Sequence, residues 1–394
     1  MSKKFYTKSK LLINSLIVLI FFIFTGCKKG CTDPSASNYD PGAKTNDASE
    51  CEYEDNVLIP FDGESFLINL SDNFITPSIE LYKNSVDDLV TATNNFNSDM
   101  TTAKLDTLKN SWYTALLNWQ GISFIGPSKY LTTTQIELTN IFPVDTLSVI
   151  DNLTNNYSPT DNDQEGFQAI DYLLFSKNSQ ETIDYFNNNS FASQYLSILV
   201  DNISIITNDV HTKWANEKQD FVNNNTSVSN GSSISLMTNA LNKHYEYYIR
   251  RGKFGLPLNV FDQFSQEVDP HLVECYYYGQ SLPFAIRAIE SLQNFVKGCA
   301  YDNSEDNLLG FDDYLDHVGA EYDGINLSIK IDDQFDEILV ALNGLNDPLS
   351  DEIQINKSQV DNAYDELQTL VPLLKADLTS ALGVQITYAD NDGD

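Results

Sequence analysis

The stretch that decides the fold reads GFQAIDYLLF and occupies residues 166–175. Phe167, Ile170 and Leu174 recur at the spacing of a helix stripe that faces a core. Gln168 and Asp171 are three residues apart, so they lie one above the other on a neighbouring face of the same helix. Such a pair can hold a metal, a proton or a substrate, or it can tie two helices together.

The helical pattern extends outward from this stretch over most of the chain. Apolar spacing predicts further helices over residues 71–96, 103–121, 191–222, 232–250, 270–295, 308–342 and 352–382. The two-residue alternation of a half-buried strand is not sustained anywhere, which predicts an all-α protein of bundled helices. A polar run over 223–233 predicts a boundary between two helical halves, 65–228 and 229–394.

Composition excludes one large class of partner. The chain has 394 residues and a formal net charge of −33, and nucleic acid binding needs Lys and Arg to neutralise phosphates. Aromatic residues are plentiful and charged residues make up 20%, which is typical of a globular chain. We therefore expect an acidic, folded protein that does not bind nucleic acid.

The N-terminus has the pattern of an export signal. A lysine-rich start precedes an apolar run over residues 11–24, which is short for a bilayer span. The run ends in Phe24-Thr25-Gly26-Cys27, which resembles a bacterial lipobox. We predict a signal peptide over 1–26, lipidation of Cys27, and an outer membrane lipoprotein that faces the periplasm or the exterior and meets the membrane through its lipid anchor.

We predict that residues 27–64 form a small spacer module that begins at the lipidated cysteine. Its segment 31–53 resembles a cysteine-bracketed repeat of surface proteins in the Bacteroidota, and it has too few apolar residues for a core. Cysteine counting in an exported chain makes Cys31–Cys51 and Cys275–Cys299 candidate disulfides, with buried free cysteines as the alternative for the second pair. Three acidic residues of the module are alternatively calcium ligands: Asp33, Asp40 and Asp47.

Two other segments are candidates for chemistry. His317 and Glu321 are four residues apart and would share a metal if they stood on one helix face. The basic segment 250–257 contains Lys253; it either completes a helix C-terminus, with Gly252 as the cap, or holds an anionic ligand.

Several segments together resemble the imelysin family of exported bacterial proteins, once named for a peptidase and linked to iron uptake. The resemblance covers most of residues 66–394 and implies two four-helix bundles related by a pseudo-repeat, with a cleft between them. It rests on the order and spacing of residues 73–77, 111–112, 119–120, 126–127, 142–145, 166–175, 231–233, 253–257, 274, 281–282 and 383–394.

The signature of that family is G-x-H-x-x-E on a helix at the cleft, and the matching positions here are Gly166, Gln168 and Asp171. Glutamine replaces the imidazole, which is the group able to act as a base near neutral pH, and aspartate shortens the acidic arm. The resemblance therefore implies a ligand-binding cleft formed by these three residues with Lys253 and Glu274, and it argues against peptidase chemistry.

Iron or another divalent cation is the cofactor that the resemblance suggests, with Asp171 as its candidate ligand. An iron-bearing species or a small molecule is the expected ligand, and an outer-membrane uptake protein is the expected partner. Two other functions remain open from sequence: a degenerate metallopeptidase-like enzyme, and a structural or adhesive surface protein with a vestigial cleft.

Overall fold

The computed structural model describes residues 29–32, 38–43, 45–46, 61–125, 129–224, 227–262, 265, 267–302, 304 and 308–388. The chain divides into two compact units, Met1–Phe61 and Asp62–Asp394. The predicted signal peptide, the lipidation site Cys27 and the predicted disulfide partner Cys51 lie outside the described residues.

The first unit contains a pair of very short strands. Strand β1 (Lys29–Gly30) pairs in parallel with β2 (Thr45–Asn46). Cys31 is buried and disulfide-bonded, and its bonding partner lies outside the described residues, so the pairing with Cys51 stays a prediction. The Asp40 carboxylate accepts a hydrogen bond from the Gly42 backbone amide (2.8 Å), which is the geometry of a turn.

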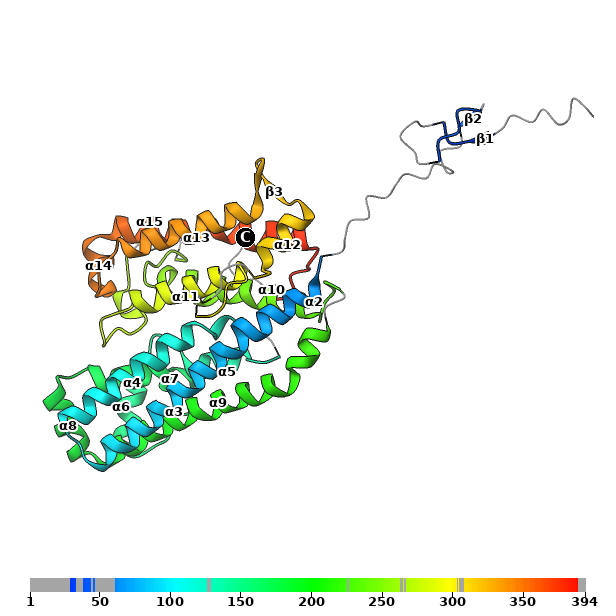
Figure 1. Cartoon of the computed structure of the whole chain (residues 1–394). Coiled ribbons are helices and arrows are strands. Elements are labelled where there is room, and N and C mark those ends of the chain that lie inside the picture. The colour runs from blue at the N-terminus through cyan, green and yellow to red at the C-terminus, as the bar shows by residue number, and fades with distance from the viewer. Residues whose placement is uncertain are drawn as a thin grey trace, which may run out of the picture. The chain divides into compact units, whose positions relative to one another are not determined.

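The second unit begins with a bundle of helices that includes the long helix α9. Helix α3 packs against α4 and α9, and α7 packs against α8 and α9 (Figure 1). The elements of this part are α2 (Gly63–Asn69), η2 (Leu70–Ile75), α3 (Thr76–Ser98), α4 (Thr102–Gln120), η3 (Ser123–Ile125), α5 (Thr133–Thr139), α6 (Thr146–Asn155), η4 (Asn162–Gln164), α7 (Gly166–Phe175), α8 (Ser179–Asn188) and α9 (Ser190–Asn223).

A second group of helices follows in the same unit. Helix α13 packs against α11 and α15, and α11 also contacts α4 of the first group, so the two layers seen in Figure 1 share one core. The elements are α10 (Ser233–His244), η5 (Tyr245–Gly255), η6 (Pro270–Leu272), α11 (Leu282–Val296), α12 (Phe311–Val318), β3 (Glu321–Tyr322), β4 (Ile325–Asn326), α13 (Leu327–Asn343), α14 (Leu349–Ile355), α15 (Lys357–Pro372), η7 (Leu373–Leu378) and α16 (Thr379–Leu382).

The all-α fold class is confirmed, because the described strands are limited to two pairs of two residues each. The predicted connection over 223–233 runs from the end of α9 to the start of α10. Contacts group Asp62–Asp394 as one compact unit, and the division into two halves stays a prediction. Within the described residues, none of the helices combines the length and hydrophobicity needed to cross a bilayer.

Two predicted helices are wrong in extent. The helix expected over 308–342 is interrupted by the β3–β4 hairpin, because Gly319 ends α12 in the left-handed conformation and Asp323 and Gly324 supply the two positive φ angles of a tight turn. The helix expected over 270–295 begins only at Leu282. The residues before Leu282 form an irregular loop that becomes part of the site.

The candidate disulfide Cys275–Cys299 is not formed, and the alternative holds: both cysteines are buried thiols. Cys275 lies near the start of α11, since the Ser281 hydroxyl donates to the neighbouring Glu274 carbonyl (2.5 Å). Cys299 follows the end of α11, which has 15 residues and is therefore about 22 Å long. A disulfide needs Cα atoms less than about 7 Å apart, so the helix keeps the two sulfurs apart.

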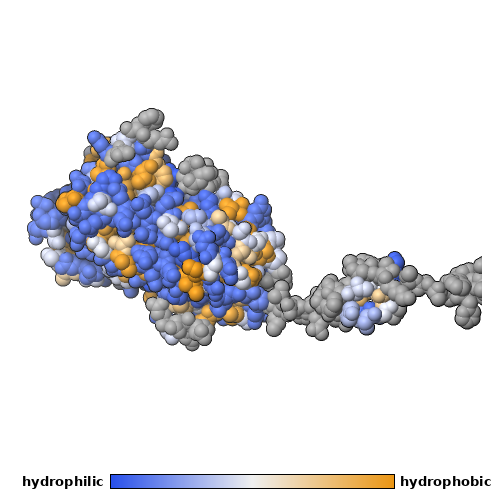
Figure 2. All heavy atoms as spheres, turned by 90° about the horizontal axis from the view of Figure 1, so that it is seen from above, coloured by the Kyte–Doolittle hydropathy of each residue, from blue (hydrophilic) through white to orange (hydrophobic). Residues whose placement is uncertain are grey.

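The surface of the second unit is largely hydrophilic. Figure 2 shows hydrophilic side chains over most of the visible face, with hydrophobic residues scattered among them. The large apolar side chains instead fill the interior, where Trp112, Phe74 and Phe295 are fully or almost fully buried. The acidic charge of the chain is thus carried on a solvated surface around an aromatic core.

Candidate functional site

Helix α7 starts at a position that only glycine fits. Gly166 has a φ of +70°, and a Cβ built on it would lie 2.3 Å from the carbonyl oxygen of Thr139. The close approach sets α7 against the end of α5, and the Trp112 indole donates to the Phe167 carbonyl (3.0 Å) from the other side. The predicted helix over 166–175 is confirmed to the residue.

The Gln168 side chain is buried and fully hydrogen-bonded. Its oxygen accepts the backbone N–H of Cys275 (2.8 Å), and its nitrogen donates to Asn140 Oδ1 (2.8 Å) and to Cys275 Sγ (3.6 Å). An amide has two donors and can satisfy them here without water. Gln168 thus fixes the loop that begins at Glu274 against α7.

The Asp171 carboxylate fixes the same loop one helical turn later. Its two oxygens accept the backbone N–H groups of Tyr277 (3.0 Å) and Tyr278 (2.9 Å), and the side chain is 1% exposed. Burial raises the pKa of Asp171 to about 8, the Glu274 carboxylate adds to the rise, and the two amides oppose it. Asp171 and Gln168 together act as a clamp on residues 274–278.

Glu274 and Lys253 form a buried ion pair behind the clamp. The Lys253 ammonium donates to Glu274 Oε2, while Glu274 Oε1 accepts from Gln120 Nε2 (3.1 Å) and Asn140 Nδ2 (2.7 Å). Lys253 lies on η5, whose helical backbone continues through Gly252, so the prediction that Gly252 caps a helix is wrong. The structure therefore brings Gln168, Asp171, Lys253 and Glu274 into one polar cluster.

Asn140 links Gln168 to Glu274 within the polar cluster. It donates to Glu274 and accepts from Gln168, and it follows α5 directly. Gln120, at the last position of α4, is the second contributor that the sequence analysis did not single out as a site residue. Gln120 lies in a segment that carries the family resemblance, whereas a single asparagine after a helix gives no signal of this role.

A cavity of about 170 Å³ lies beside the clamp. Gln168 and Asp171 form part of its wall, residues 142–146 form another part, and the loop over 271–277 closes it. The rings of His271 and Tyr276 lie 4.7 Å apart, and those of Tyr276 and Tyr277 lie 5.1 Å apart, so this loop presents a row of aromatic groups. The two predicted halves therefore both contribute to the cavity.

The residues present do not fit a metal ion at this cluster. Both oxygens of Asp171 already accept backbone amides, and Glu274 already accepts three side-chain donors, so a metal ion would have to compete with the groups that hold the cluster together. In the part of the chain that the structure describes, histidine, cysteine, aspartate and glutamate side chains form no group of three placed to hold a metal.

The predicted pair His317 and Glu321 does not share a helix face, because α12 ends at Val318 and Glu321 lies in β3. Of the four histidines, His244 is buried, with Nε2 at 3.1 Å from the Ser123 hydroxyl. Burial lowers the pKa of His244 to about 3, and the nearby Lys253 ammonium adds to the effect. His244 is therefore a neutral core residue at physiological pH.

The buried Asp171 predicts a pH dependence. Because its folded-state pKa is raised, the stability it contributes is present at low pH and is lost as the pH rises from about 4 toward 8. Relative to Asp171→Asn, which does not titrate, wild-type protein should lose about 3 to 4 kcal/mol of unfolding free energy between pH 5 and pH 8. Urea titrations at the two pH values measure this difference, with the exposed Asp184→Asn as control. Parallel profiles for all three proteins would refute it.

Fold and site define an all-α protein in which a buried polar cluster fixes an aromatic loop beside a small cavity. The chain belongs to the imelysin family, whose model (Peptidase_M75: Imelysin) matches residues 75–376. Within the family motif, the histidine and glutamate positions carry Gln168 and Asp171, which here bond to the chain itself.

Two solved structures are similar to this chain. One, from Parabacteroides distasonis ATCC 8503, is described as an iron-regulated protein A precursor; it has a TM-score of 0.67 and 14% identity and covers 81% of this chain and 95% of its own. The other is an imelysin-like protein from Psychrobacter arcticum 273-4, with a TM-score of 0.64, 12% identity and coverage of 83% and 97%. At these identities the likeness concerns the fold. No curated protein sequence matches the chain.

Proposed function

We propose that this chain is an exported lipoprotein that binds a small ligand in the cavity beside Gln168 and Asp171, and that it serves iron-linked uptake at the outer membrane. The observation that carries the proposal is the cavity itself, which is lined by residues of the family motif and by an aromatic loop. The lysine-rich start, the apolar run and Cys27 support export and lipid anchoring.

The size and lining of the cavity favour a ring-sized organic group. Its volume of about 170 Å³ is close to that of an engineered protein cavity of about 150 Å³ that holds one benzene molecule. Phe142 and the tyrosines of the loop offer flat apolar surfaces, and His271 and Thr146 add polar groups. A planar ligand with hydrogen-bonding substituents matches these walls.

Iron would reach this cavity inside a chelate. A bare ferric ion would have to compete with the amides bound to Asp171 or to deprotonate Tyr277, whose pKa is raised by burial and by neighbouring Tyr276 and Asp171. A chelate carries its own metal ligands, and one of its aromatic rings would fill a cavity of this size while the iron stays at the mouth. The name of the iron-regulated structural neighbour supports an iron-linked role without identifying the ligand.

Ligand titration tests the proposal. We expect ferric dihydroxybenzoate, followed by isothermal titration calorimetry, to bind wild-type protein and to bind Tyr277→Ala at least tenfold more weakly, because the variant removes one ring of the cavity wall. Tyr157→Ala is the matched control, since Tyr157 is exposed and does not line the cavity. Uncomplexed ferric iron should bind neither wild type nor Asp171→Ala. Chelate binding that is unchanged in Tyr277→Ala, or absent from wild type, would exclude the cavity.

A further inference from the structure

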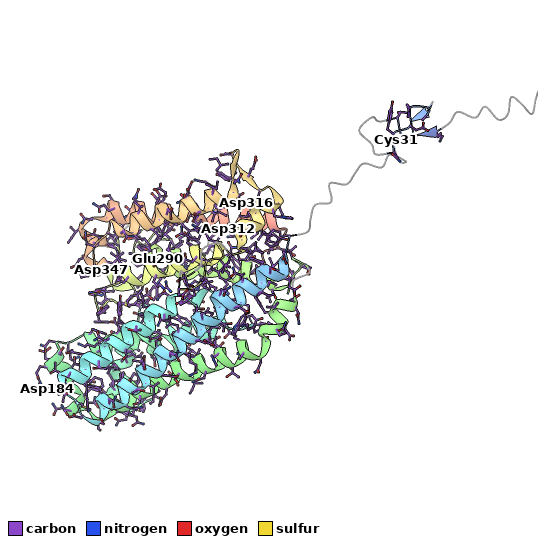
Figure 3. All side chains as sticks on the ribbon, viewed as in Figure 1. Cys31, Asp184, Glu290, Asp312, Asp316 and Asp347 are labelled. Carbon is purple, nitrogen blue, oxygen red and sulfur yellow. The ribbon has the colours of Figure 1, made fainter. Side chains whose placement is uncertain are left out.

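A second cavity is formed by α12, α13 and the end of α11. It measures about 180 Å³, and its polar wall consists of Asp312 and Asp316 from α12 with Ser328 and Asp332 from α13. Asp312 and Asp316, both labelled in Figure 3, are four residues apart on α12, which is about one helical turn. None of these residues belongs to the polar cluster around Glu274, so this cavity is separate from the proposed ligand site.

The cavity carries an excess of negative charge. Lys297 is its one basic lining residue and pairs with Asp332 (2.8 Å), while Asp316 accepts the Ser328 hydroxyl (2.5 Å). Three carboxylates thus face one ammonium group. Oδ1 of Asp312 is shielded from solvent and has no hydrogen-bond partner among the described residues, and burial raises the pKa of Asp312 to about 6. An added cation with N–H donors would relieve this imbalance.

The shape of the cavity favours an organic cation over a metal ion. The described residues here form no group of acidic and histidine side chains placed to hold a metal. The floor of the cavity is apolar instead, with buried Phe335 and Val296 beside the carboxylates. Lysine and arginine side chains combine an aliphatic stem with a charged head, which matches an apolar floor and an acidic wall.

An exposed apolar rim adjoins the acidic wall. Ile329 lines the cavity and is 51% exposed, and the hairpin that connects α12 to α13 exposes Ile325 (50%) and Tyr322 (39%). Val318, the last residue of α12, is 45% exposed. Both hairpin strands contact α13, the helix that carries Ile329, so the exposed hairpin side chains lie beside the helix that forms one wall of the cavity. A ligand that fits inside the cavity would leave this rim in water.

We propose that the α12–hairpin–α13 surface, defined by Asp312, Asp316, Ile325 and Ile329, docks a protein segment in which an arginine or lysine is flanked by apolar residues. The cation enters the cavity, and the flanking apolar side chains cover the rim. Charge complementarity supports a partner of this chemistry, because this protein itself carries a net charge of −33. The size of the rim favours a protein segment over a free amine.

Binding of labelled peptides to the full chain, followed by fluorescence anisotropy, tests the docking surface. The probe has one arginine flanked by two leucines on each side, and its neutral twin has citrulline in place of arginine. We expect the arginine peptide to bind at least tenfold more tightly than the twin. The double variant Asp312→Asn/Asp316→Asn should lose that preference, and Ile325→Ser/Ile329→Ser should weaken binding of both peptides.

Two controls on α13 match these variants. Asp333→Asn removes one exposed charge outside the cavity, and Val340→Ser removes an apolar side chain that is 69% exposed away from the hairpin. Both should bind the arginine peptide as wild type does. Equal affinity for the two peptides, equal losses in the control variants, or binding of free 1,5-diaminopentane as tight as that of the peptide would each overturn the proposal. Chelate binding at the first cavity should be the same in all these variants.

Discussion

Replacing Lys253 with methionine is expected to lower the free energy of unfolding by about 3 to 5 kcal/mol, the range typical of breaking a buried ion pair. Lys253 is 4% exposed and Glu274 is 1% exposed, so the variant leaves a buried carboxylate without its counter-charge. Gln120 and Asn140 would still donate to Glu274, but neither carries charge. Urea denaturation followed by circular dichroism measures the change.

Two further variants separate charge from packing at this pair. Lys253→Met combined with Glu274→Gln should recover part of the loss, since the amide oxygen can still accept from Asn140 and no charge remains buried. Lys83→Met, which breaks the more exposed Lys83–Asp87 pair, should cost less than about 1 kcal/mol. A double variant no more stable than Lys253→Met alone would show that lost packing, and not an uncompensated charge, causes the damage.

Substituting alanine for Gly166 is expected to cost about 2 to 5 kcal/mol, the sum of a left-handed backbone and an overpacked contact. The φ of +70° accounts for the first part. The second arises because the new Cβ would lie 2.3 Å from the Thr139 carbonyl oxygen, a backbone atom that cannot turn away. Moving α7 would also shift Gln168 and Asp171, so Gly166→Ala should weaken chelate binding as well.

Gly231→Ala is the control for this prediction, because Gly231 has a φ of +89° but a Cβ there would meet nothing within 4 Å. It should show only the backbone cost, about 1 to 2 kcal/mol. The difference between the two variants, measured by urea denaturation, reports the contact with Thr139. Equal losses in both would mean that α5 moves aside and that Gly166 is required for its backbone alone.

Local patterns predicted much of the fold. The apolar spacing over 166–175 gave a helix with the observed bounds, because a buried stripe at helical spacing depends only on neighbours in the sequence. The hairpin at 321–326 was missed although its Asp323-Gly324 turn is a strong local signal, since the long apolar pattern around it favoured one continuous helix. Gly319 and Gly324 are helix-breaking residues inside that stretch, and the prediction gave them too little weight against the apolar pattern.

The residues of the candidate site could also be predicted only in part. Sequence alone identified Gln168 and Asp171 as a polar pair on one helix face, and other segments of the family resemblance pointed to Lys253 and Glu274. The sequence could not predict which atoms these side chains contact. Gln168 bonds to Cys275, which is 107 residues away, and Glu274 bonds to Asn140, which is 134 residues away. Residues that far apart leave no periodic trace in a single chain.

The sequence by itself determined an all-α chain, its family and the helix that carries the motif, since helical periodicity and residue identity are local properties. Only the tertiary structure decided what the motif does. Folding brings the amides of Cys275, Tyr277 and Tyr278 onto Gln168 and Asp171, and these hydrogen bonds compete with a metal for the same oxygens. The polar pair on α7 is thus a clamp, and the cavity beside it is where we propose that a ligand binds.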